Sequence, residues 1–186
     1  MKTIIGIAGK IAGGKGIAAE HIISRYHAGS IDYSQFLYQI LDIFDVPHER
    51  KNINALSIFL RATYGQKIFN NAVLRELEQR KEDVVVLTGI RRGQELDGLS
   101  AIPGFVFLYI ESDIHTRYER NRDAARKPGD AEMSFEQFAE KDSDDSNRTI
   151  EGLKTRADHV IENNGTTDEF LERLDLICSD LLYLHH

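Results

Sequence analysis

A glycine-rich loop near the start of the chain constrains its fold more strongly than any other stretch of the sequence. The loop GKIAGGKGI, residues 9–17, follows an apolar run at residues 3–8 and precedes a segment with the apolar spacing of a helix. Glycines crowded between a strand and a helix are typical of the first β-loop-α unit of an α/β protein. We therefore expect the chain to begin with such a unit.

Further apolar runs of strand length follow, and longer segments with helical spacing separate them. We expect strands near residues 3–8, 29–31, 83–88, 105–110 and 158–161. We expect helices over residues 17–26, 34–44, 57–80, 113–123, 134–145 and 167–182. Short buried strands that alternate with helices predict a parallel sheet covered by helices. Residues 33–80 contain no strand pattern, which suggests a helical insertion at one edge of the sheet.

The composition limits the classes of function that remain. With 186 residues, 41% of them hydrophobic, the chain is long enough for one folded domain, which we expect to span residues 1–186. A formal net charge of −7 argues against a nucleic-acid partner, and no apolar run is long enough for a membrane span. The single Cys178 excludes an intramolecular disulfide, and Lys10 interrupts the only candidate signal segment, so we expect a cytoplasmic location. The composition leaves the oligomeric state open.

The loop also fits the pattern GxxxxGK, which predicts the binding of a polyphosphate. Glycines let successive backbone N–H groups turn toward one point, the helix N-terminus adds its dipole, and Lys15 adds a full positive charge. The alternative is a glycine-rich turn that holds no ligand. The residues expected to form a phosphate-binding loop are Gly9, Ala12, Gly13, Gly14, Lys15, Gly16 and Ile17.

The position after Lys15 departs from the general pattern. Ser or Thr stands there in the pattern and its hydroxyl binds Mg²⁺, whereas this chain has Gly16. Adenylate-kinase-like enzymes also carry GKG, usually followed by Thr, and here Ile17 follows. The metal is then held mainly through water, or held weakly.

Five segments carry a resemblance to a known family. They are GIAGKIAGGKG, SIDYSQFLYQIL, VVVLTGIRRGQEL, RYERNRDAARKPGD and RADHVIENNGTTDEFLERL. Together they span most of the chain and resemble the nucleoside monophosphate kinase branch of phosphate-loop (P-loop) proteins, particularly dephospho-coenzyme A kinases and deoxynucleoside monophosphate kinases. The resemblance implies a three-layer α/β/α fold with a five-stranded parallel sheet, an acceptor-binding helical insertion near residues 33–80 and a lid near residues 117–133. It also implies ATP and Mg²⁺ as cofactors.

The resemblance assigns acceptor-side roles to residues that follow two predicted strands. Asp32 would act near the acceptor as a general base or hold a metal-bound water, and the alternative role, capping a helix that begins near Ser34, is compatible with it. Thr88 stands where family members often have Asp, so no direct metal ligand is expected and Mg²⁺ would lie near Asp32 and Thr88 through water. The acceptor-binding residues are expected to be Asp32, Arg61, Arg91 and Arg92, with Glu95 orienting one arginine through an ion pair.

The donor-side roles fall on a basic helix and on an asparagine turn. Arg117 and Arg120 are three residues apart on one helix face and could converge on one anion, and Arg122 and Arg126 extend this predicted lid. The alternative is a solvated, charged helix surface. Asn163 and Asn164 are expected to contact the adenine, unless they form an ordinary turn. The acidic run at residues 140–145 is interpreted as a solvated helix face rather than a metal site.

Three hypotheses about function follow from this sequence, one of them a small-molecule kinase that acts outside nucleotide metabolism. The first is ATP-dependent transfer of the γ-phosphoryl group to a small nucleotide-like acceptor: a nucleoside or deoxynucleoside monophosphate, or dephospho-coenzyme A. Its expected catalytic residues are Lys15, Asp32 and Arg120. The alternative starts from the missing hydroxyl at Ile17 and the missing carboxylate at Thr88: an ATP-binding sensor or scaffold with weak or no kinase activity.

Overall fold

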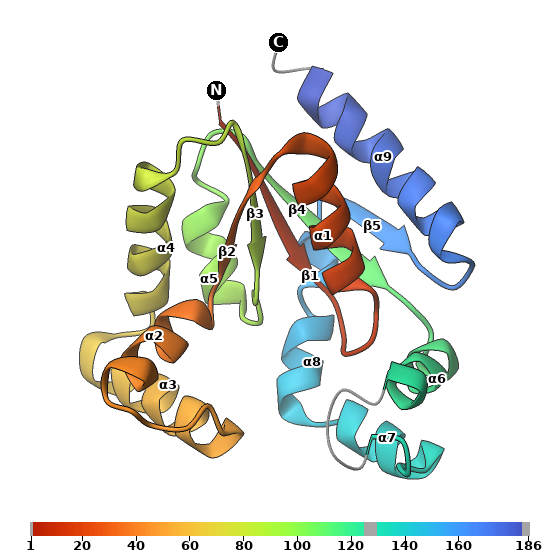
Figure 1. Ribbon diagram of the computed structural model, residues 1–186, viewed down its shortest axis with the longest axis horizontal. Coiled ribbons are helices and arrows are strands. Elements are labelled where there is room, and N and C mark those ends of the chain that lie inside the picture. The colour runs from red at the N-terminus through yellow and green to blue at the C-terminus, as the bar shows by residue number, and fades with distance from the viewer. Residues whose placement is uncertain (1, 125–129, 184–186) are drawn as a thin grey trace.

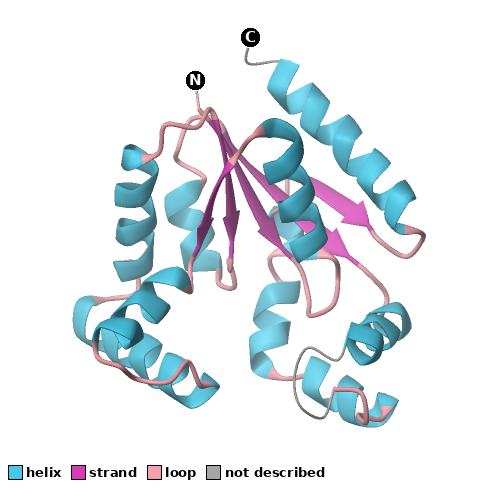
Figure 2. Ribbon diagram, in the orientation of Figure 1, coloured by secondary structure: helices cyan, strands magenta, loops and turns pink. Residues whose placement is uncertain are grey.

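The computed structural model describes residues 2–124 and 130–183, except for the side chains of residues 145–147 and 183. It contains a five-stranded sheet in the order β2-β3-β1-β4-β5, and every pair of neighbours is parallel (Figure 2). The strands are β1 Thr3–Ala8, β2 Gly29–Asp32, β3 Val84–Thr88, β4 Phe105–Glu111 and β5 His159–Glu162. The predicted parallel α/β fold is confirmed.

Helices connect the strands and form two further groups beyond the sheet. The described α-helices are α1 Lys15–Tyr26, α2 Gln35–Ile43, α3 Arg50–Tyr64, α4 Ile68–Gln79, α5 Gly93–Leu99, α6 Ile114–Ala124, α7 Phe135–Asp142, α8 Asp145–Glu151 and α9 Thr167–Tyr183. A short 3-10 turn, Lys154–Arg156, precedes β5. Within the described parts of the chain, no helix combines the length and apolar character needed to cross a bilayer.

The central strands are apolar on both faces because helices cover the sheet on both sides. One buried cluster joins β1 and β4 to α1 and α9, with Ile22 and Leu174 among its members. The other cluster lies on the opposite face and includes side chains of α4, α5 and α8, such as Val73 and Leu96. Figure 1 shows α1 and α9 in front of the sheet, so the three layers are helix, sheet and helix.

The strand order places the carboxyl end of β1 at a branching point. From β1 the chain builds β2 and β3 on one side, and it later adds β4 and β5 on the other side. In open α/β sheets, ligands bind outside the carboxyl ends of the strands where the order reverses. The loop that follows β1 therefore lies at the position where this fold class binds its ligands.

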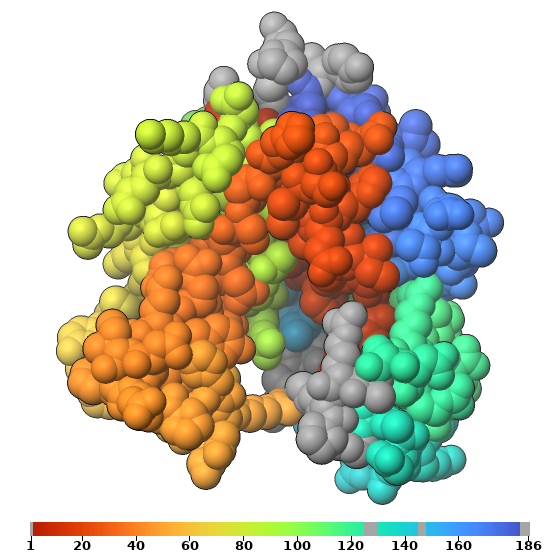
Figure 3. Space-filling model, viewed as in Figure 1, coloured from red at the N-terminus to blue at the C-terminus, as the bar shows by residue number. Residues whose placement is uncertain are grey.

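Two groups of helices extend past these strand ends, although α4, the last helix of the first group, runs alongside the sheet (Figure 1). We call them the α2–α4 lobe, residues 35–79, and the α6–α8 lobe, residues 114–151. The space-filling view shows the surface hollowed between the two lobes (Figure 3).

The structure corrects three helix predictions. The helix expected over residues 57–80 is two helices, because Gly65 ends α3 with a φ of 90° that favours glycine. The short helices α5 and α8 were not predicted. Gly93 and Gly98 lower the helix propensity of α5, and α8 follows α7 too closely for the two to give separate apolar patterns.

Candidate functional site

The predicted phosphate loop connects β1 to α1 at the branching point of the sheet. Gly14 takes a left-handed conformation, with φ of 103°, immediately before the first turn of α1. A Cβ atom there would also overlap the amide nitrogen of Asn163, so this position requires glycine for two reasons. The first turn of α1 carries no acidic residue, so its N–H groups and its dipole favour an anion.

Lys15 is the first residue of α1, and its side chain turns back toward the loop. Its Nζ atom donates a hydrogen bond of 2.6 Å to the carbonyl of Lys10. The carbonyl of Gly14 accepts the first helical bond, from the amide of Ala18 at 3.0 Å. The loop thus has a defined shape with an ammonium group held against it.

Asn163 lies beneath the loop, where it connects the loop to β5. Its Nδ2 atom donates to the carbonyl of Gly13 at 3.0 Å, and its Oδ1 atom accepts from Nη2 of Arg120 at 3.2 Å. The carbonyl of Asn163 accepts from Nη1 of Arg120 at 2.8 Å. Asn163 is 3% exposed, so these partners and not a base edge use its polar atoms here. Asn164 is exposed and accepts from the amide of Asp113 at 2.8 Å.

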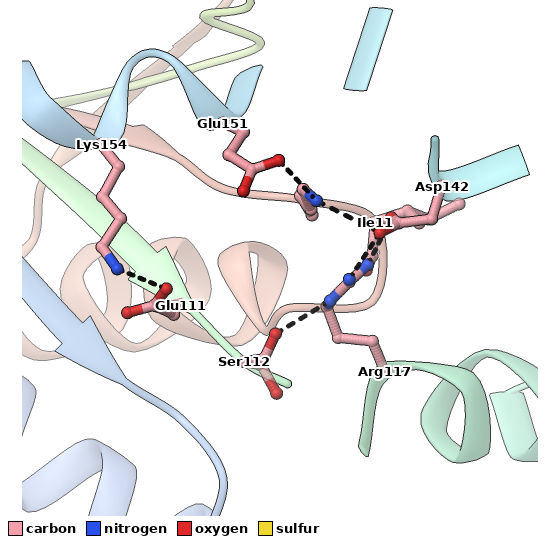
Figure 4. Close-up of polar contacts among 8 residues, drawn as sticks. Ile11, Glu111, Ser112, Arg117, Asp142, Glu151 and Lys154 are labelled. Atoms are coloured by element: carbon pink, nitrogen blue, oxygen red, sulfur yellow. Dashed lines mark hydrogen bonds and ion pairs between the residues drawn. The ribbon is translucent and has the colours of Figure 1, made fainter. Parts of the chain in front are cut away.

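Arg117 does not converge with Arg120 on a common anion position. It is 3% exposed, and its two terminal nitrogens donate to both oxygens of Asp142 at 2.6 and 2.8 Å (Figure 4). Its Nε atom donates to the carbonyl of Ser112 at 3.0 Å. The expectation that Arg117 and Arg120 point at one site is wrong for this structure, because a buried carboxylate takes Arg117 while backbone and amide oxygens take Arg120.

Asp142 is the centre of a charge network that reaches the phosphate loop. Lys10, the second residue of the loop, lies 3.2 Å from Asp142 and 3.0 Å from Glu151. Burial on its own would raise the pKa of the Asp142 carboxyl, but the hydrogen bonds and charges of Arg117 and Lys10 hold it below its usual value. The network therefore links α6, α7 and α8 to the loop through ionised groups.

The remaining residues of the predicted lid are placed differently. Arg122 is exposed and pairs with the neighbouring Asp123 at 3.2 Å, which matches the alternative of a charged helix surface. Arg126, with the centre of the predicted lid, lies outside the described residues.

Asp32 and Thr88 face each other at the ends of β2 and β3, where they are register partners. The Thr88 hydroxyl donates to one oxygen of Asp32 at 2.6 Å, and the amide of Ser34 donates to the other at 2.7 Å. Asp32 therefore does support the start of α2, as its alternative role requires. Each carboxylate oxygen can accept a further bond.

These residues fit a Mg²⁺ ion that is held mainly through water and substrate phosphates. Gly16 has no side chain, although a Cβ there would meet no atom within 4 Å. Among the described residues, no three His, Cys, Asp or Glu side chains gather into a metal cluster. Mg²⁺ usually keeps several waters and binds through one or two carboxylates plus substrate phosphates. The Asp32 carboxylate beside the Thr88 hydroxyl fits that mode.

A second buried ion pair organises the predicted acceptor arginines. Arg61 donates to Oε1 of Glu95 at 2.7 Å and its guanidinium lies 4.4 Å from the centre of the Phe69 ring. The other oxygen of Glu95 accepts the backbone amides of Arg91 and Arg92 at 2.7 and 3.0 Å. Glu95 was expected to pair with one of these two arginines. It pairs with Arg61 instead, because one of its oxygens lies against the Arg61 guanidinium and the other accepts the backbone amides of the turn.

The buried polar chain continues into the α2–α4 lobe. Asn70 donates to the carbonyl of Glu95 at 3.0 Å and accepts from the Tyr33 hydroxyl at 3.3 Å. Burial raises the pKa of Tyr33 above its ordinary value, and the charge of Glu95 adds to this shift. The side chains of Arg91 and Arg92 are exposed and form no ion pair with any residue that the structure describes.

Sequence reasoning missed the importance of Asp142 and Lys10. The acidic run was interpreted as solvated, and that is wrong for Asp142, which is 6% exposed. Helical spacing offered one signal: Phe138 and Asp142 are four residues apart and both buried, so Asp142 continues the apolar face of α7. Its partners are 25 and 132 residues away, and no local pattern reveals them.

Comparisons with known proteins support the fold. No protein-family model matches the chain. It is 28% identical over 185 residues to a UPF0200 protein of Methanococcus vannielii, covering 96% of each chain. It is also 26% identical over 181 residues to a UPF0200 protein of Methanocaldococcus jannaschii, covering 96% of this chain and 90% of the relative.

Solved structures of similar shape include two named kinases. A shikimate kinase from Acinetobacter baumannii in complex with shikimate matches with a TM-score of 0.56 and 18% identity, over 97% of this chain and 95% of that one. A gluconokinase from Sinorhizobium meliloti matches with a TM-score of 0.57 and 14% identity, over 100% and 98%. TT1252 from Thermus thermophilus matches with a TM-score of 0.59 and 19% identity, over 97% and 98%. The chain thus shares its α/β fold with these kinases, and the narrower likeness to nucleoside monophosphate or dephospho-coenzyme A kinases stays a prediction.

Proposed function

We propose that the protein is an ATP-dependent phosphotransferase that moves the γ-phosphoryl group to a small nucleotide-like acceptor. One observation carries the proposal. A GxxxxGK loop, with Lys15 held against it, follows the central strand β1, and on the same edge of the sheet Asp32 ends β2 and the exposed Arg91 and Arg92 follow β3. Phosphoryl transfer needs mainly positioning and charge stabilisation, which this arrangement supplies without a covalent nucleophile.

On the donor side, the loop amides and the N-terminus of α1 would hold the β- and γ-phosphates. Lys15 would exchange the carbonyl of Lys10 for a phosphate oxygen, since both lie within reach of its flexible side chain. Arg120 reaches the turn after β5, where its Nη2 atom lies 3.3 Å from the carbonyl of Gly165. We propose that Arg120 and Asn164 border the space for the adenine.

On the acceptor side, we propose that Arg91 and Arg92 hold an anionic group of the acceptor. Their guanidinium groups are exposed and can reach a ligand, while Glu95 holds the backbone from which both side chains extend. Asp32 ends β2, beside the end of β3 that these arginines follow, and would accept the proton of a hydroxyl acceptor or orient a water on Mg²⁺. Bound Mg²⁺ would neutralise charge on the phosphates.

The second candidate is a nucleotide-binding protein that senses or scaffolds. It is favoured by Gly16, Ile17 and Thr88, which leave the loop and β3 without the usual metal-associated side chains.

Within the phosphotransferase proposal, the acceptor group decides the substrate. If the accepting group is a phosphate, the substrate is a nucleoside monophosphate, and if it is a hydroxyl, the substrate is dephospho-coenzyme A.

The test measures ADP formation with Mg²⁺ and ATP across nucleoside monophosphates, deoxynucleoside monophosphates and dephospho-coenzyme A. We expect turnover with one acceptor class, and we expect Lys15→Ala to reduce it by about 100-fold or more, in line with losses of single charge-stabilising groups. Lys2→Ala is the matched control, because Lys2 also donates to backbone carbonyls, those of Leu77 and Arg80, but lies at the amino end of β1, opposite the loop. Calorimetric ATP binding without turnover on any acceptor would support the second candidate, and the absence of binding would reject both.

A further inference from the structure

The phosphate loop contains a turn with an unfavourable backbone conformation. The amide of Gly13 donates to the carbonyl of Lys10 at 3.2 Å and closes a turn of four residues. The third residue of this turn, Ala12, has a φ of 57°, in the left-handed region. Turns with a left-handed third residue favour glycine or asparagine there, because a Cβ atom crowds the backbone. Contacts from outside the turn must therefore hold Ala12 in this conformation.

The φ angle of Ala12 depends on which way one peptide group points. The two common kinds of four-residue turn differ mainly in the orientation of the peptide between their second and third residues. Here that group joins Ile11 to Ala12, and a left-handed third residue belongs to only one of its two orientations. In a planar trans peptide the carbonyl and the N–H point in opposite directions. Rotation of this group would exchange the sides on which the Ile11 carbonyl and the Ala12 N–H lie.

Arg117 is placed to hold the Ile11 carbonyl. Its Nη1 atom lies 3.5 Å from the Ile11 oxygen, across 106 residues of chain (Figure 4). This is long for a hydrogen bond, but the contact is shielded from water because Arg117 is 3% exposed, and a full charge there attracts a carbonyl dipole. Both terminal nitrogens of Arg117 donate to Asp142, and its Nε atom donates to Ser112. The guanidinium group therefore cannot turn away from the loop without losing these bonds.

The other loop carbonyls have partners of their own. The carbonyl of Lys10 accepts from Lys15 at 2.6 Å, and the carbonyl of Gly13 accepts from Asn163 at 3.0 Å. These bonds hold the two ends of the turn. Arg117 bears on the peptide between them, whose orientation sets the φ of the strained residue.

We propose that Arg117, held by Asp142, is a positioning residue for the donor phosphates. By attracting the Ile11 carbonyl it turns the N–H of Ala12 toward the phosphates and adds one donor to the anion-binding loop. The rotated peptide would present a carbonyl oxygen to the phosphates and repel them. This inference rests on the proposed function, since it requires a polyphosphate in the loop.

Direct binding of a phosphate by Arg117 fits the structure less well. Both of its terminal nitrogens are bound to the two oxygens of Asp142, at 2.6 and 2.8 Å. A phosphate would have to displace this carboxylate and would leave Asp142, which is 6% exposed, without the charge of its main partner. A positioning role keeps the pair intact.

The test measures the dissociation constant of ADP by calorimetry with the full chain. Arg117→Met with Asp142→Leu removes the contact without leaving a buried charge, and we expect ADP binding to weaken by about 10-fold or more, as for one lost hydrogen bond to a charged group. The matched control is Arg25→Met with Asp175→Leu. These residues pair at 3.1 Å between the last turn of α1 and α9, and their loss should leave the constant unchanged. Urea denaturation verifies that both double variants are folded.

A glycine at position 12 tests the mechanism separately. Glycine adopts a left-handed φ without steric cost, so Ala12→Gly should favour the binding orientation of the peptide even without Arg117. We expect it to strengthen ADP binding by about 5-fold in the Arg117→Met, Asp142→Leu background, and by a smaller factor in the wild type. A merely structural role for the pair, or direct contact between Arg117 and ADP, predicts the same factor in both backgrounds.

The outcomes distinguish this inference from the function on which it rests. A wild type that binds no ADP would reject the donor site and the inference together. If the wild type binds ADP and the double variant binds it as tightly, or glycine gives equal factors, the inference alone is overturned and the phosphotransferase proposal stands. Should the double variant not fold, Arg117→Lys gives the same comparison, because a single ammonium group does not reproduce the two-pronged contact with Asp142.

Discussion

Each lobe supplies the arginine of a buried arginine–carboxylate pair, but the two carboxylates hold different kinds of partner. On the α6–α8 side, Asp142 binds Arg117 through both oxygens and also binds Lys10 of the phosphate loop. On the α2–α4 side, Glu95 gives one oxygen to Arg61 and the other to two backbone amides. Asp142 thus binds only side-chain cations, whereas Glu95 binds one side-chain cation and the backbone of a turn.

This difference bears on the two anion sites that we propose. Near the loop, the cations Lys10 and Arg117 are already balanced by Asp142 and Glu151, so the charge that remains for a donor comes from Lys15, the amides and the helix dipole. Near the end of β3, the guanidinium groups of Arg91 and Arg92 stay exposed. The first site is stabilised before any ligand binds, and the second keeps side-chain charges available for one.

The largest effect should come from Asp142→Ala. It leaves Arg117 buried without a counter-charge, so we expect the free energy of unfolding to fall by about 3–5 kcal/mol. Urea denaturation measures this. The matched control is Glu151→Ala, because Glu151 also pairs with Lys10 but is exposed, and its loss should stay below about 1 kcal/mol.

Two further measurements define that effect. Replacing both partners by apolar residues, Arg117→Met with Asp142→Leu, should recover most of the loss, since no buried charge remains. Because the folded-state pKa of Asp142 is lowered, its contribution is complete above the unfolded value near about 4 and is lost as the pH falls through the folded value. A difference between wild type and Asp142→Ala that did not shrink in acid would contradict the ionised pair.

A smaller effect is expected for Glu95→Gln. The amide oxygen of Gln can still accept one backbone bond, and Arg61 keeps the carbonyl of Gln66 and the Phe69 ring, so we expect a loss of about 1–3 kcal/mol. Hydrogen exchange should be faster at the amides of Arg91 and Arg92 and unchanged in the phosphate loop. Equal acceleration in both places would mean that the two sites are not organised independently.

The sequence allowed the fold to be predicted because its signals are local. The β1-loop-α1 unit, the buried strands and the helical stretch after β2 all follow from residues close in the chain, and all are present. The family resemblance, and not the local patterns, placed Asp32 near Thr88, and the parallel register of β2 and β3 makes the two residues partners. Gly65 shows the limit of this approach, because one residue divided a helix that apolar spacing alone predicted as continuous.

The partners of the charged side chains could not be predicted in the same way. Asp142, Glu95 and Asn163 each bind atoms from distant segments, and a charged or amide side chain in sequence gives no sign of being buried. The expected convergence of Arg117 and Arg120 was wrong because spacing on a helix fixes a face and not a partner. Electrostatic pairing depends on the assembled fold, which is why the site was harder to predict than the sheet.

The smallest expected effect concerns Gly16. It distinguishes Gly14, which the conformation of the loop requires, from Gly16, where a larger residue would fit. Gly16 lies in the first turn of α1 with space for a Cβ, so Gly16→Ala should raise the free energy of unfolding by up to about 1 kcal/mol by reducing the freedom of the unfolded chain. Gly14→Ala is the contrasting control and should lower it, because of its positive φ and the contact with Asn163.

Gly16→Ser extends the same comparison to chemistry, since it places a hydroxyl where P-loop proteins bind Mg²⁺. We expect it to lower the Mg²⁺ concentration needed for half-maximal ATP binding by a few-fold while Gly16→Ala leaves that concentration unchanged. Titration of Mg²⁺ at fixed ATP measures the difference. If serine and alanine behave alike, the metal lies out of reach of position 16, and Asp32 with Thr88 must orient it alone.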